Sequence, residues 1–213
     1  MKFGRAEMPK ASPKKAYHHG DLRRAIIDAG EAELAERGLE GFSLRRVSAR
    51  VGVSHTAPAH HFGDAAGLIN ALAERGFHRL LEAMVARQAT APRDAYEQLI
   101  ASGLGYLAFA EQDPALFRLI FSLPKGPDPG AAVMAAADAA FLHLAGNVAA
   151  LHGAEPMAHP GAYEEVMACW TRVHGFAELM LAGHLAPPCA GRAGAHEALF
   201  RKVFGAEFAA KVG

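Results

Sequence analysis

The sequence has little of what a disulfide-stabilised, membrane-spanning or disordered protein requires. Only two of its 213 residues are cysteines, Cys169 and Cys189, so no disulfide framework is expected. The first ten residues lack an apolar run, which predicts no secretory signal. The most apolar stretch, Ala131–Leu142, is interrupted by Asp138 and too short to span a bilayer. With 51% hydrophobic residues, the chain can bury a core, and we expect a soluble, cytoplasmic protein with no membrane partner.

The chain as a whole also lacks a net charge, because its 22 Lys and Arg residues balance its 22 Asp and Glu residues. The balance hides an asymmetry along the sequence. Residues 1–24 contain seven basic and two acidic side chains, whereas the chain from residue 65 onward contains 11 basic and 14 acidic ones. A basic end on a mildly acidic body fits a polyanionic partner that touches one end only.

Helical periodicity dominates the remaining pattern, and alternating β-branched runs are missing, which predicts an all-α fold. Gly38 and Gly52 are expected to end helices, while Ser43 and Asp64 are expected to begin them. The predicted helices are Asp21–Arg37, Ser43 to the residue before Gly52, Ser54–Phe62, Asp64–Gln88, Arg93–Ala110, Pro114–Phe121, Ala131–Leu151, Gly161–Leu185 and Ala195–Lys211.

These helices predict three regions. Residues 1–16 form a flexible basic arm, and residues 17–75 form a three-helix domain with a helix-turn-helix. The long fourth helix connects this domain to a helical bundle over residues 76–213, with the boundary near Gly76. Within residues 39–54 a short helix is followed by a tight turn at Gly52, an apolar anchor at Val53 and a new helix start at Ser54. Such a unit places one short helix in the DNA major groove.

Three motifs carry a more specific resemblance. Residues 17–62, which include Ser54-His55-Thr56-Ala57-Pro58, resemble the N-terminal domain of TetR-family transcriptional regulators. Asp113–Phe121 and Trp170–Gly175 resemble body helices of the branch with a Trp-x-x-x-His-Gly signature. The resemblance implies a dimeric regulator of transcription, usually a repressor that a small molecule releases from a palindromic operator in double-stranded DNA.

The resemblance also implies roles for single residues. Ser43 would bind a phosphate at a helix N-terminus, Arg45 would reach DNA, and Lys14 and Lys15 of the arm would add phosphate contacts. The remaining predicted DNA-binding residues are Arg46, Ser54, His55, Thr56, Ala57, His60 and His61. The sequence departs from the family at Ala59 and Ala65, where Tyr and Lys usually hold phosphates, and this departure should weaken the sequence-independent part of binding.

Other interpretations of these residues remain open. Arg45, Arg46 and Arg50 also fit an ordinary solvated helix face, although within this motif we favour DNA contact for Arg45. The pairs at residues 18–19 and 60–61 are not expected to bind metal, because adjacent helical side chains diverge and no Cys or carboxylate completes a ligand set. No cofactor is expected.

Aromatic and methionine side chains of the body helices are the candidates for a ligand cavity, which predicts an apolar or aromatic effector. They are Phe109, Phe117, Phe121, Met134, Phe141, Met167, Trp170 and His174. For His174, a hydrogen-bonded place in the core and a place in the pocket are equally favoured.

The last two helices are the candidates for a homodimer interface. Small residues on the Gly161–Leu185 helix permit close helix approach, and the final helix has more apolar surface than one subunit needs. These residues are Ala168, Gly175, Ala182 and Gly183 on the first helix, and Leu199, Phe200, Val203, Phe204 and Phe208 on the second.

Two rival functions remain. An enzyme using His174 or Cys169 would need a nucleophile–base set, a phosphate loop or a metal cluster, and the sequence has none at meaningful spacing, so no enzyme is expected. A TetR-like dimer that has weakened or lost DNA binding, and acts through protein contacts, is supported only by Ala59 and Ala65.

Overall fold

The computed structural model describes residues 19–122, 129–158, 160–185 and 194–211, and within them the chain is helical with no strand, which confirms the predicted all-α class. The helices are α1 (His19–Arg37), α2 (Leu44–Val51), α3 (Ala57–Phe62), α4 (Ala65–Ala89), α5 (Ala95–Gln112), α6 (Pro114–Ser122), α7 (Ala131–Ala150), α8 (Ala162–Leu181) and α9 (Ala195–Lys211).

Local chemistry places most helix ends where the sequence predicts them. Gly38 and Gly52 follow α1 and α2 with φ of 66° and 74°, a left-handed conformation that suits glycine. The amide of Gly52 donates to the carbonyls of Ser48 and Ala49, which closes the turn of the helix-turn-helix. Asp64 caps α4, since its carboxylate accepts a hydrogen bond from the Gly67 amide.

The third helix is shorter than predicted, because Ser54 begins a turn rather than a helix. The Ser54 hydroxyl accepts a hydrogen bond from the Thr56 amide at 3.3 Å, and its carbonyl accepts one from the Ala57 amide at 3.0 Å. Side chains of this type compete with the helical backbone for hydrogen bonds, so the helix starts only at Ala57, with the buried Pro58 in its first turn.

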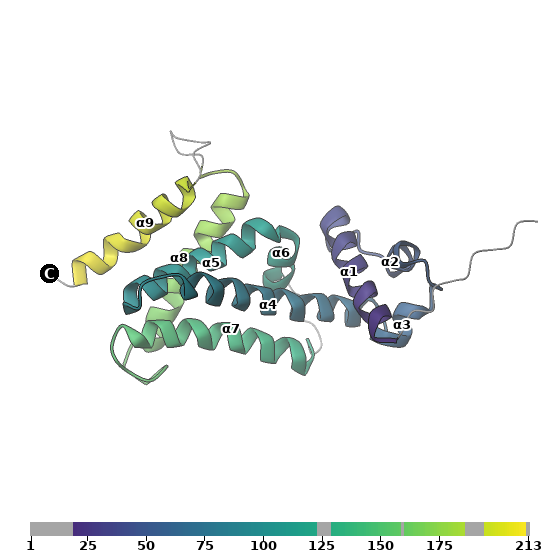
Figure 1. Cartoon of the computed structure of the whole chain (residues 1–213), viewed down its shortest axis with the longest axis horizontal. Coiled ribbons are helices and arrows are strands. Elements are labelled where there is room, and N and C mark those ends of the chain that lie inside the picture. The colour runs from purple at the N-terminus through teal and green to yellow at the C-terminus, as the bar shows by residue number, and fades with distance from the viewer. Residues whose placement is uncertain (1–18, 123–128, 159, 186–193, 212–213) are drawn as a thin grey trace, which may run out of the picture.

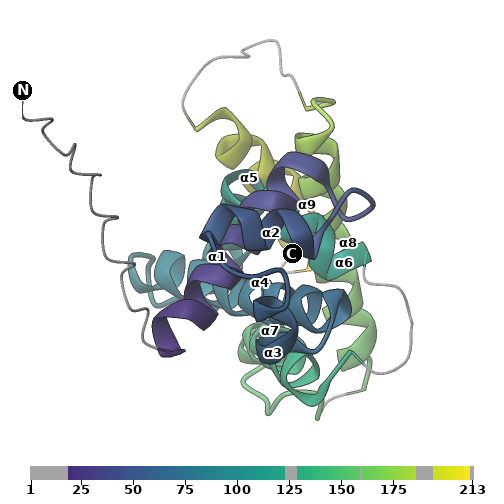
Figure 2. The same cartoon turned by 90° about the vertical axis from the view of Figure 1, so that its right-hand side faces the viewer.

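Helix α4 runs along the long axis of the molecule (Figure 1). Helices α1, α2 and α3 gather around its N-terminal end and form what we call the head. Helices α5 to α9 surround the rest of α4 and form the body, with α7 along one side and α5 along another. Viewed from the head end, α2 and α3 lie nearest the viewer (Figure 2).

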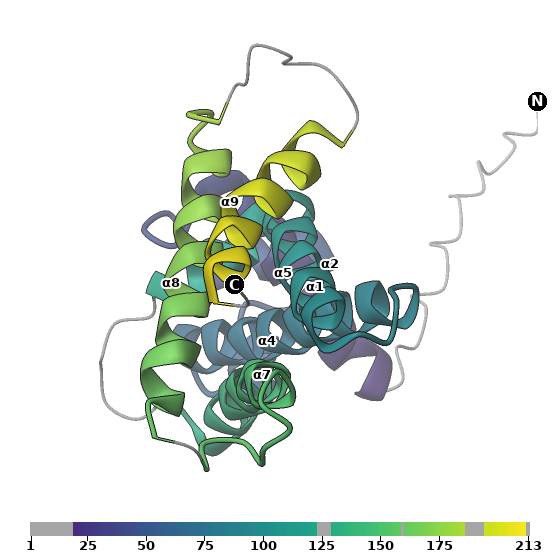
Figure 3. The same ribbon diagram turned by 90° about the vertical axis from the view of Figure 1, so that its left-hand side faces the viewer.

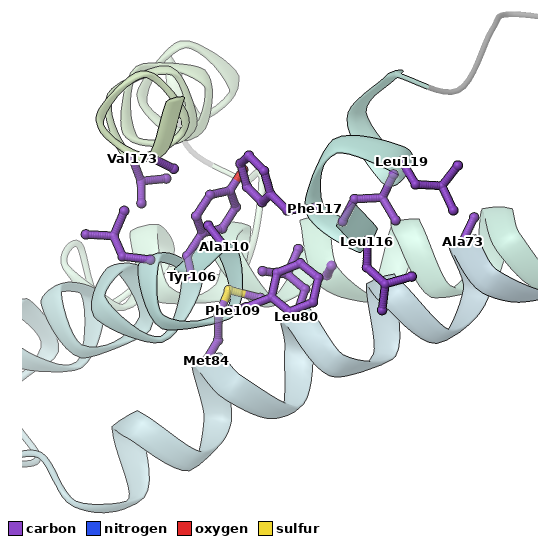
Figure 4. Close-up of a cluster of buried hydrophobic side chains, with 14 of the residues drawn as sticks. Ala73, Leu80, Met84, Tyr106, Phe109, Ala110, Leu116, Phe117, Leu119 and Val173 are labelled. Atoms are coloured by element: carbon purple, nitrogen blue, oxygen red, sulfur yellow. The ribbon is translucent and has the colours of Figure 1, made fainter. Parts of the chain in front are cut away.

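The body core is built mainly from α4, α5 and α6, whose apolar side chains converge (Figure 4). Leu80 and Met84 of α4 meet Phe109 of α5 and Phe117 of α6 in this cluster. Helix α5 approaches α4 closely at Gly105, where a Cβ would lie 2.4 Å from the Ala83 carbonyl oxygen. A side chain at this position would separate the two helices.

Helix α7 is longer than the apolar stretch that the sequence suggested. By length and composition it would suffice to cross a membrane, the one described helix that meets this test. It packs on α4, α5 and α8 and buries Val133, Ala140 and Val148 against them. The rest of α7 is largely exposed, including Met134 and Leu142, so the helix covers one side of the body.

The end of the body is formed by α8 and α9 (Figure 3). Part of the predicted dimer surface lies inside the subunit: Phe200 and Phe204 are buried, and the ring of Phe200 lies 5.3 Å from that of Phe176. The prediction that Phe200 and Phe204 lie in a subunit interface is therefore wrong. Val203 of α9 is 53% exposed, while the side chain of Phe208 lies outside the described residues.

Candidate DNA interface and ligand cavity

Glu33 of α1 organises the head. Its side chain is fully buried, and both carboxylate oxygens are paired with arginines of α2. Arg46 Nε donates to Oε1, and Arg50 Nε donates to Oε2 at 3.4 Å. Arg46 also donates to the Gly41 carbonyl, and Arg50 to Glu36. A buried carboxylate needs such partners, so these two arginines hold α2 on α1.

Arg45 differs from its two neighbours. It is exposed, and among the described residues it has no ion-pair or hydrogen-bond partner. The prediction that Arg46 contacts DNA therefore meets a competing role, because its guanidinium is already bonded within the head. Arg45 has a guanidinium available for a phosphate or a base edge. Ser43 occupies the N-cap position of α2, but its hydroxyl makes no capping hydrogen bond, which also leaves it available.

The α3 region presents a polar outer surface. The side chains of His55, Thr56 and His60 are exposed, whereas Pro58 is buried beneath them. Ser54 is exposed and bonded to Thr56, with their hydroxyl oxygens 2.9 Å apart. The predicted residues Ala57 and His61 are only partly exposed. The structure thus places the exposed polar side chains of His55, Thr56 and His60 together on the outer side of α3 and the turn before it.

The departures from the family pattern lie on this same part of the head. Ala59 is exposed on α3, and Ala65 is the first residue of α4, directly after its cap Asp64. A longer polar side chain has room at Ala59, since the position faces solvent. Lys14 and Lys15 of the predicted arm lie outside the described residues.

The body encloses a cavity of about 450 Å³, a size typical of sites for small molecules. It lies among α4, α5, α6, α7, α8 and α9, and its wall is mostly apolar. Rings of Phe77, Tyr106, Phe121, Phe141 and Trp170 contribute most of its aromatic surface. The other lining residues are Leu80, Met84, Leu99, Ser102, Gly103, Ile120, Ala137, Asp138, Ala140, Leu144, Cys169, Val173 and Phe204.

Three of the predicted ligand-binding residues line this cavity: Phe121, Phe141 and Trp170. The other five do not. Phe109 and Phe117 are almost completely buried core residues, and Met134 is 47% exposed on α7. Met167 and His174 of α8 lie outside the lining as well. Residues of both kinds repeat at helical spacing, so periodicity alone does not separate a cavity wall from a packed core.

His174 belongs to a hydrogen-bonded cluster behind the cavity wall. Its Nδ1 lies 2.8 Å from the Tyr106 hydroxyl oxygen, and its ring stacks on Phe117 with centroids 5.5 Å apart. Trp170 lies beside the same hydroxyl, and its indole N–H, which can only donate, opposes the rise in the pKa of Tyr106 that burial causes.

This arrangement gives the Trp170–His174 spacing a physical role. The two side chains stand one helical turn apart on α8 and both lie beside the Tyr106 hydroxyl of α5, to which His174 is hydrogen-bonded. Burial raises the pKa of Tyr106, so its hydroxyl keeps its proton across the physiological range. Tyr106 itself lines the cavity, and a ligand that displaces its ring disturbs the whole cluster.

Tyr106 and Asp138 are the most informative of the lining residues that the sequence interpretation missed. Leu99, Ser102, Gly103 and Tyr106 follow each other at helical spacing on α5 and all face the cavity. A stripe that mixes glycine and serine with large apolar residues was the available signal, because small residues leave room beside a helix. In the sequence, Asp138 stands out only because it interrupts an apolar run.

The head and the body meet where α6 packs between α1 and α4. Gly76 of α4 allows this contact, since a Cβ there would lie 2.7 Å from Ile120 Cγ2 of α6. Arg79 of α4 donates to Glu31 of α1 at 2.6 Å and to Asp113, which directly precedes α6, at 3.0 Å. One side chain therefore connects the head helix, the long helix and the start of α6.

No group of three or more His, Cys, Asp or Glu side chains is placed to hold a metal ion within the described ranges. His60 and His61 are adjacent on α3, and His61 packs against Phe62 with ring centroids 6.2 Å apart. Cys169 is buried in the cavity wall.

Similarity to solved structures extends over nearly the whole chain. A protein of unknown function from Rhodococcus sp. RHA1 is 29% identical, with a TM-score of 0.75 over 89% of this chain and 95% of that one. The regulator PfmR from Thermus thermophilus is 16% identical, with a TM-score of 0.60 over 84% and 93%. A TetR-like transcriptional regulator from Rhodococcus sp. RHA1 is 17% identical, with a TM-score of 0.62 over 89% and 100%.

Two family profiles match the sequence. Residues 26–72 match the bacterial regulatory proteins of the tetR family, and residues 99–204 match the tetracyclin repressor-like C-terminal domain. No curated protein matches the chain in sequence. Regulators of this family are DNA-binding proteins without enzymatic activity, which confirms that the chain is not an enzyme. The chain therefore belongs to the tetR family of transcription regulators, and its N-terminal helices form the family's DNA-binding helix-turn-helix domain.

Proposed function

We propose that this regulator is a homodimeric repressor that leaves a palindromic operator when a small apolar molecule fills the body cavity. The observation that carries the proposal is the shared helix α4. Its N-terminal half packs on α1 and α3 of the head, and Phe77, Leu80 and Met84 of the same helix line the cavity. Ligand and DNA therefore act on one continuous element.

The DNA side of the proposal rests on the surface around Arg45 and α3. Arg45 has no partner within the described head, and His55, Thr56 and His60 are exposed beside it in the motif. A histidine can donate to a guanine edge or a phosphate, and a threonine methyl can contact a thymine methyl. Two such heads in a symmetric dimer read two half-sites about one helical turn apart, which requires a palindrome.

The coupling rests on α6. Phe121 near its C-terminal end lines the cavity, while Ile120 of the same helix contacts the Gly76 position on α4. A ligand that moves Phe121 moves α6 against α4 and α1, and so changes the direction of the head. Only the difference in ligand affinity between the two states shifts the equilibrium, typically by about 1–3 kcal/mol.

The dimer interface of the proposal lies on α8 and α9. Leu179 and Val203 are 47% and 53% exposed, and large apolar side chains of this kind gather where a partner covers them. Gly175 of α8 has open space around its Cβ position, which allows a second helix to come close. A regulator of chromosomal DNA of this kind is cytoplasmic, and we assign the protein there. The branch with the Trp-x-x-x-His-Gly signature also remains our prediction.

The test is a binding selection from a pool of random DNA duplexes, with the full chain at low ionic strength. The proposal expects one palindromic sequence, bound by a dimer. Arg45→Ala should weaken binding about tenfold and lower the salt dependence by about one phosphate contact, with unchanged thermal unfolding. Arg93→Ala, an equal charge change at an exposed body position, should leave binding unchanged. A monomeric protein, or a pool without a preferred sequence, would contradict the proposal.

The same experiment decides the second candidate, a dimer that acts through protein contacts. Its support is the exposed Ala59 and the helix-start position Ala65. If the wild type selects no duplex but the Ala59→Tyr, Ala65→Lys double variant does, DNA binding has been lost in this chain. If the wild type selects a sequence, the double variant should bind all duplexes more tightly, because phosphate contacts are independent of sequence.

A further inference from the structure

The cavity wall favours one sign of charge. Among the described residues that line the cavity there is no Lys, Arg or His, and Asp138 is the one carboxylate. The other acidic groups are weak acids: Cys169 is a buried thiol, and burial raises the pKa of the Tyr106 hydroxyl. In the described part of the wall a ligand therefore meets at most one formal charge, the carboxylate of Asp138.

The Asp138 carboxylate is available for a ligand. It has no ion-pair or hydrogen-bond partner among the described residues, and its side chain is exposed. Because it both lines the cavity and reaches solvent, it marks a point where the cavity opens. This carboxylate is therefore not occupied by an interaction within the described part of the fold.

Aromatic rings line the same cavity as this carboxylate. Phe141 lies three residues after Asp138 on α7, so the two side chains share a helix face. The Phe141 ring is 6.4 Å from that of Trp170, which lies 6.2 Å from that of Phe121. The faces of aromatic rings attract cations, and a carboxylate beside them adds to this attraction.

We propose that the cavity selects an organic cation, namely a quaternary ammonium or protonated amine on an apolar body, and rejects anions of the same shape. The charged group lies between Asp138 and the rings of Phe141 and Trp170, and the apolar body fills the space beside Phe77 and Leu80. The inference rests on the proposed function, since it names the class of effector for that same cavity.

Trp170 provides the measurement, because it is the one tryptophan of the chain and lines the cavity. Three probes share one body and differ in charge: 4-phenylbutyl-trimethylammonium, 4-phenylbutanol and 4-phenylbutane-sulfonate. Each is titrated into the full-length protein without DNA, and the change in Trp170 emission gives its dissociation constant. Ala140→Phe, which fills the cavity from α7, should abolish the change and so locate the binding.

We expect the ammonium probe to bind at least about tenfold more tightly than the sulfonate, with the alcohol between them. Asp138→Asn should remove most of this preference, because it should weaken the binding of the ammonium probe alone. The exposed Asp138 has no partner in the described chain, so this change should leave the fold intact. Glu111→Gln, the same change at an exposed residue outside the cavity, should preserve the preference.

Equal binding of cation and anion, tighter binding of the anion, or no binding of the ammonium probe would each overturn the proposal. So would a cation preference that survives Asp138→Asn. None of these results depends on DNA, so they are distinguishable from a failure of the proposed function. A protein that selects no operator can still show the charge preference. Conversely, a cavity that binds the three probes equally well does not change operator binding.

Discussion

The head and the body of this regulator are held together by different chemistry. In the head, a buried carboxylate, Glu33, pairs with two arginines and fixes α2 on α1. In the body, rings of Tyr106, Phe117 and Phe121 pack within about 6 Å of each other, and Tyr106 and Phe121 line the cavity. The difference teaches that two arginines of α2 are used within the head while Arg45 on the same helix has no partner among the described residues, whereas the body has a cavity that a ligand can fill.

The largest expected effect is a break confined to the head. Glu33→Ala leaves Arg46 and Arg50 without their shared partner and empties a buried site, which should cost about 3 kcal/mol. Hydrogen exchange should show faster exchange in α1 and α2 and unchanged protection in α5 and α8. Glu40→Ala, at an exposed head position, is the control and should change neither. Equal loss of protection in head and body would show that the two regions are not separate.

The matching break in the body removes one oxygen. Tyr106→Phe leaves His174 Nδ1 without its hydroxyl partner, which should cost about 2 kcal/mol in thermal or denaturant unfolding. The emission spectrum of Trp170 should shift, whereas the affinity for DNA and its dependence on Arg45 should not change. Tyr163→Phe on the exposed side of α8 makes the same chemical change and should be neutral. An unchanged emission spectrum in Tyr106→Phe would argue against the cluster.

A smaller effect is expected at the contact between the two regions. Gly76→Ala places a methyl group 2.7 Å from Ile120 Cγ2, so α6 must shift, with a net cost of about 1 kcal/mol and weaker operator binding. Gly146→Ala in the middle of α7 meets nothing within 4 Å and should instead gain about 0.5–1 kcal/mol. Denaturant unfolding and operator titration measure both. If Gly76→Ala behaves like Gly146→Ala, α6 is not tightly packed on α4.

The smallest expected effect is a pH dependence of the body. Burial lowers the pKa of His143, whose Nε2 is buried without a hydrogen-bond partner in the described structure. The unfolded chain then binds a proton at a higher pH than the folded chain does. Stability should therefore fall as the pH drops below the ordinary histidine value near 6.5 and should stop falling once folded His143 is also protonated. His143→Gln should flatten this profile; an unaltered profile would contradict the assignment.

Much of the fold was predictable because its signals are local. Gly38, Gly52 and Asp64 end or begin helices through backbone conformation and a short-range hydrogen bond, and the predicted ends there are confirmed. The shortening of α3 was also local, but the choice between a turn and a helix at Ser54 depends on competing hydrogen bonds that the sequence pattern does not rank.

The site was less predictable because it depends on contacts between distant residues. Nothing near Arg45 and Arg46 in sequence distinguishes them, and their different roles follow from Glu33 lying on the preceding helix. Likewise, Phe117 and Phe121 stand one turn apart on α6, yet only Phe121 lines the cavity. The angle at which helices cross decides such cases, and periodicity does not provide it.

The central claim is that the head and the cavity are coupled through α4 and α6, and coupling is reciprocal. The direct test is to titrate the selected operator duplex into the full-length protein and follow emission from Trp170 in the cavity wall, with labelled DNA reporting binding in parallel. The account predicts a change in emission that saturates together with operator binding. Saturated operator binding with unchanged Trp170 emission would contradict it.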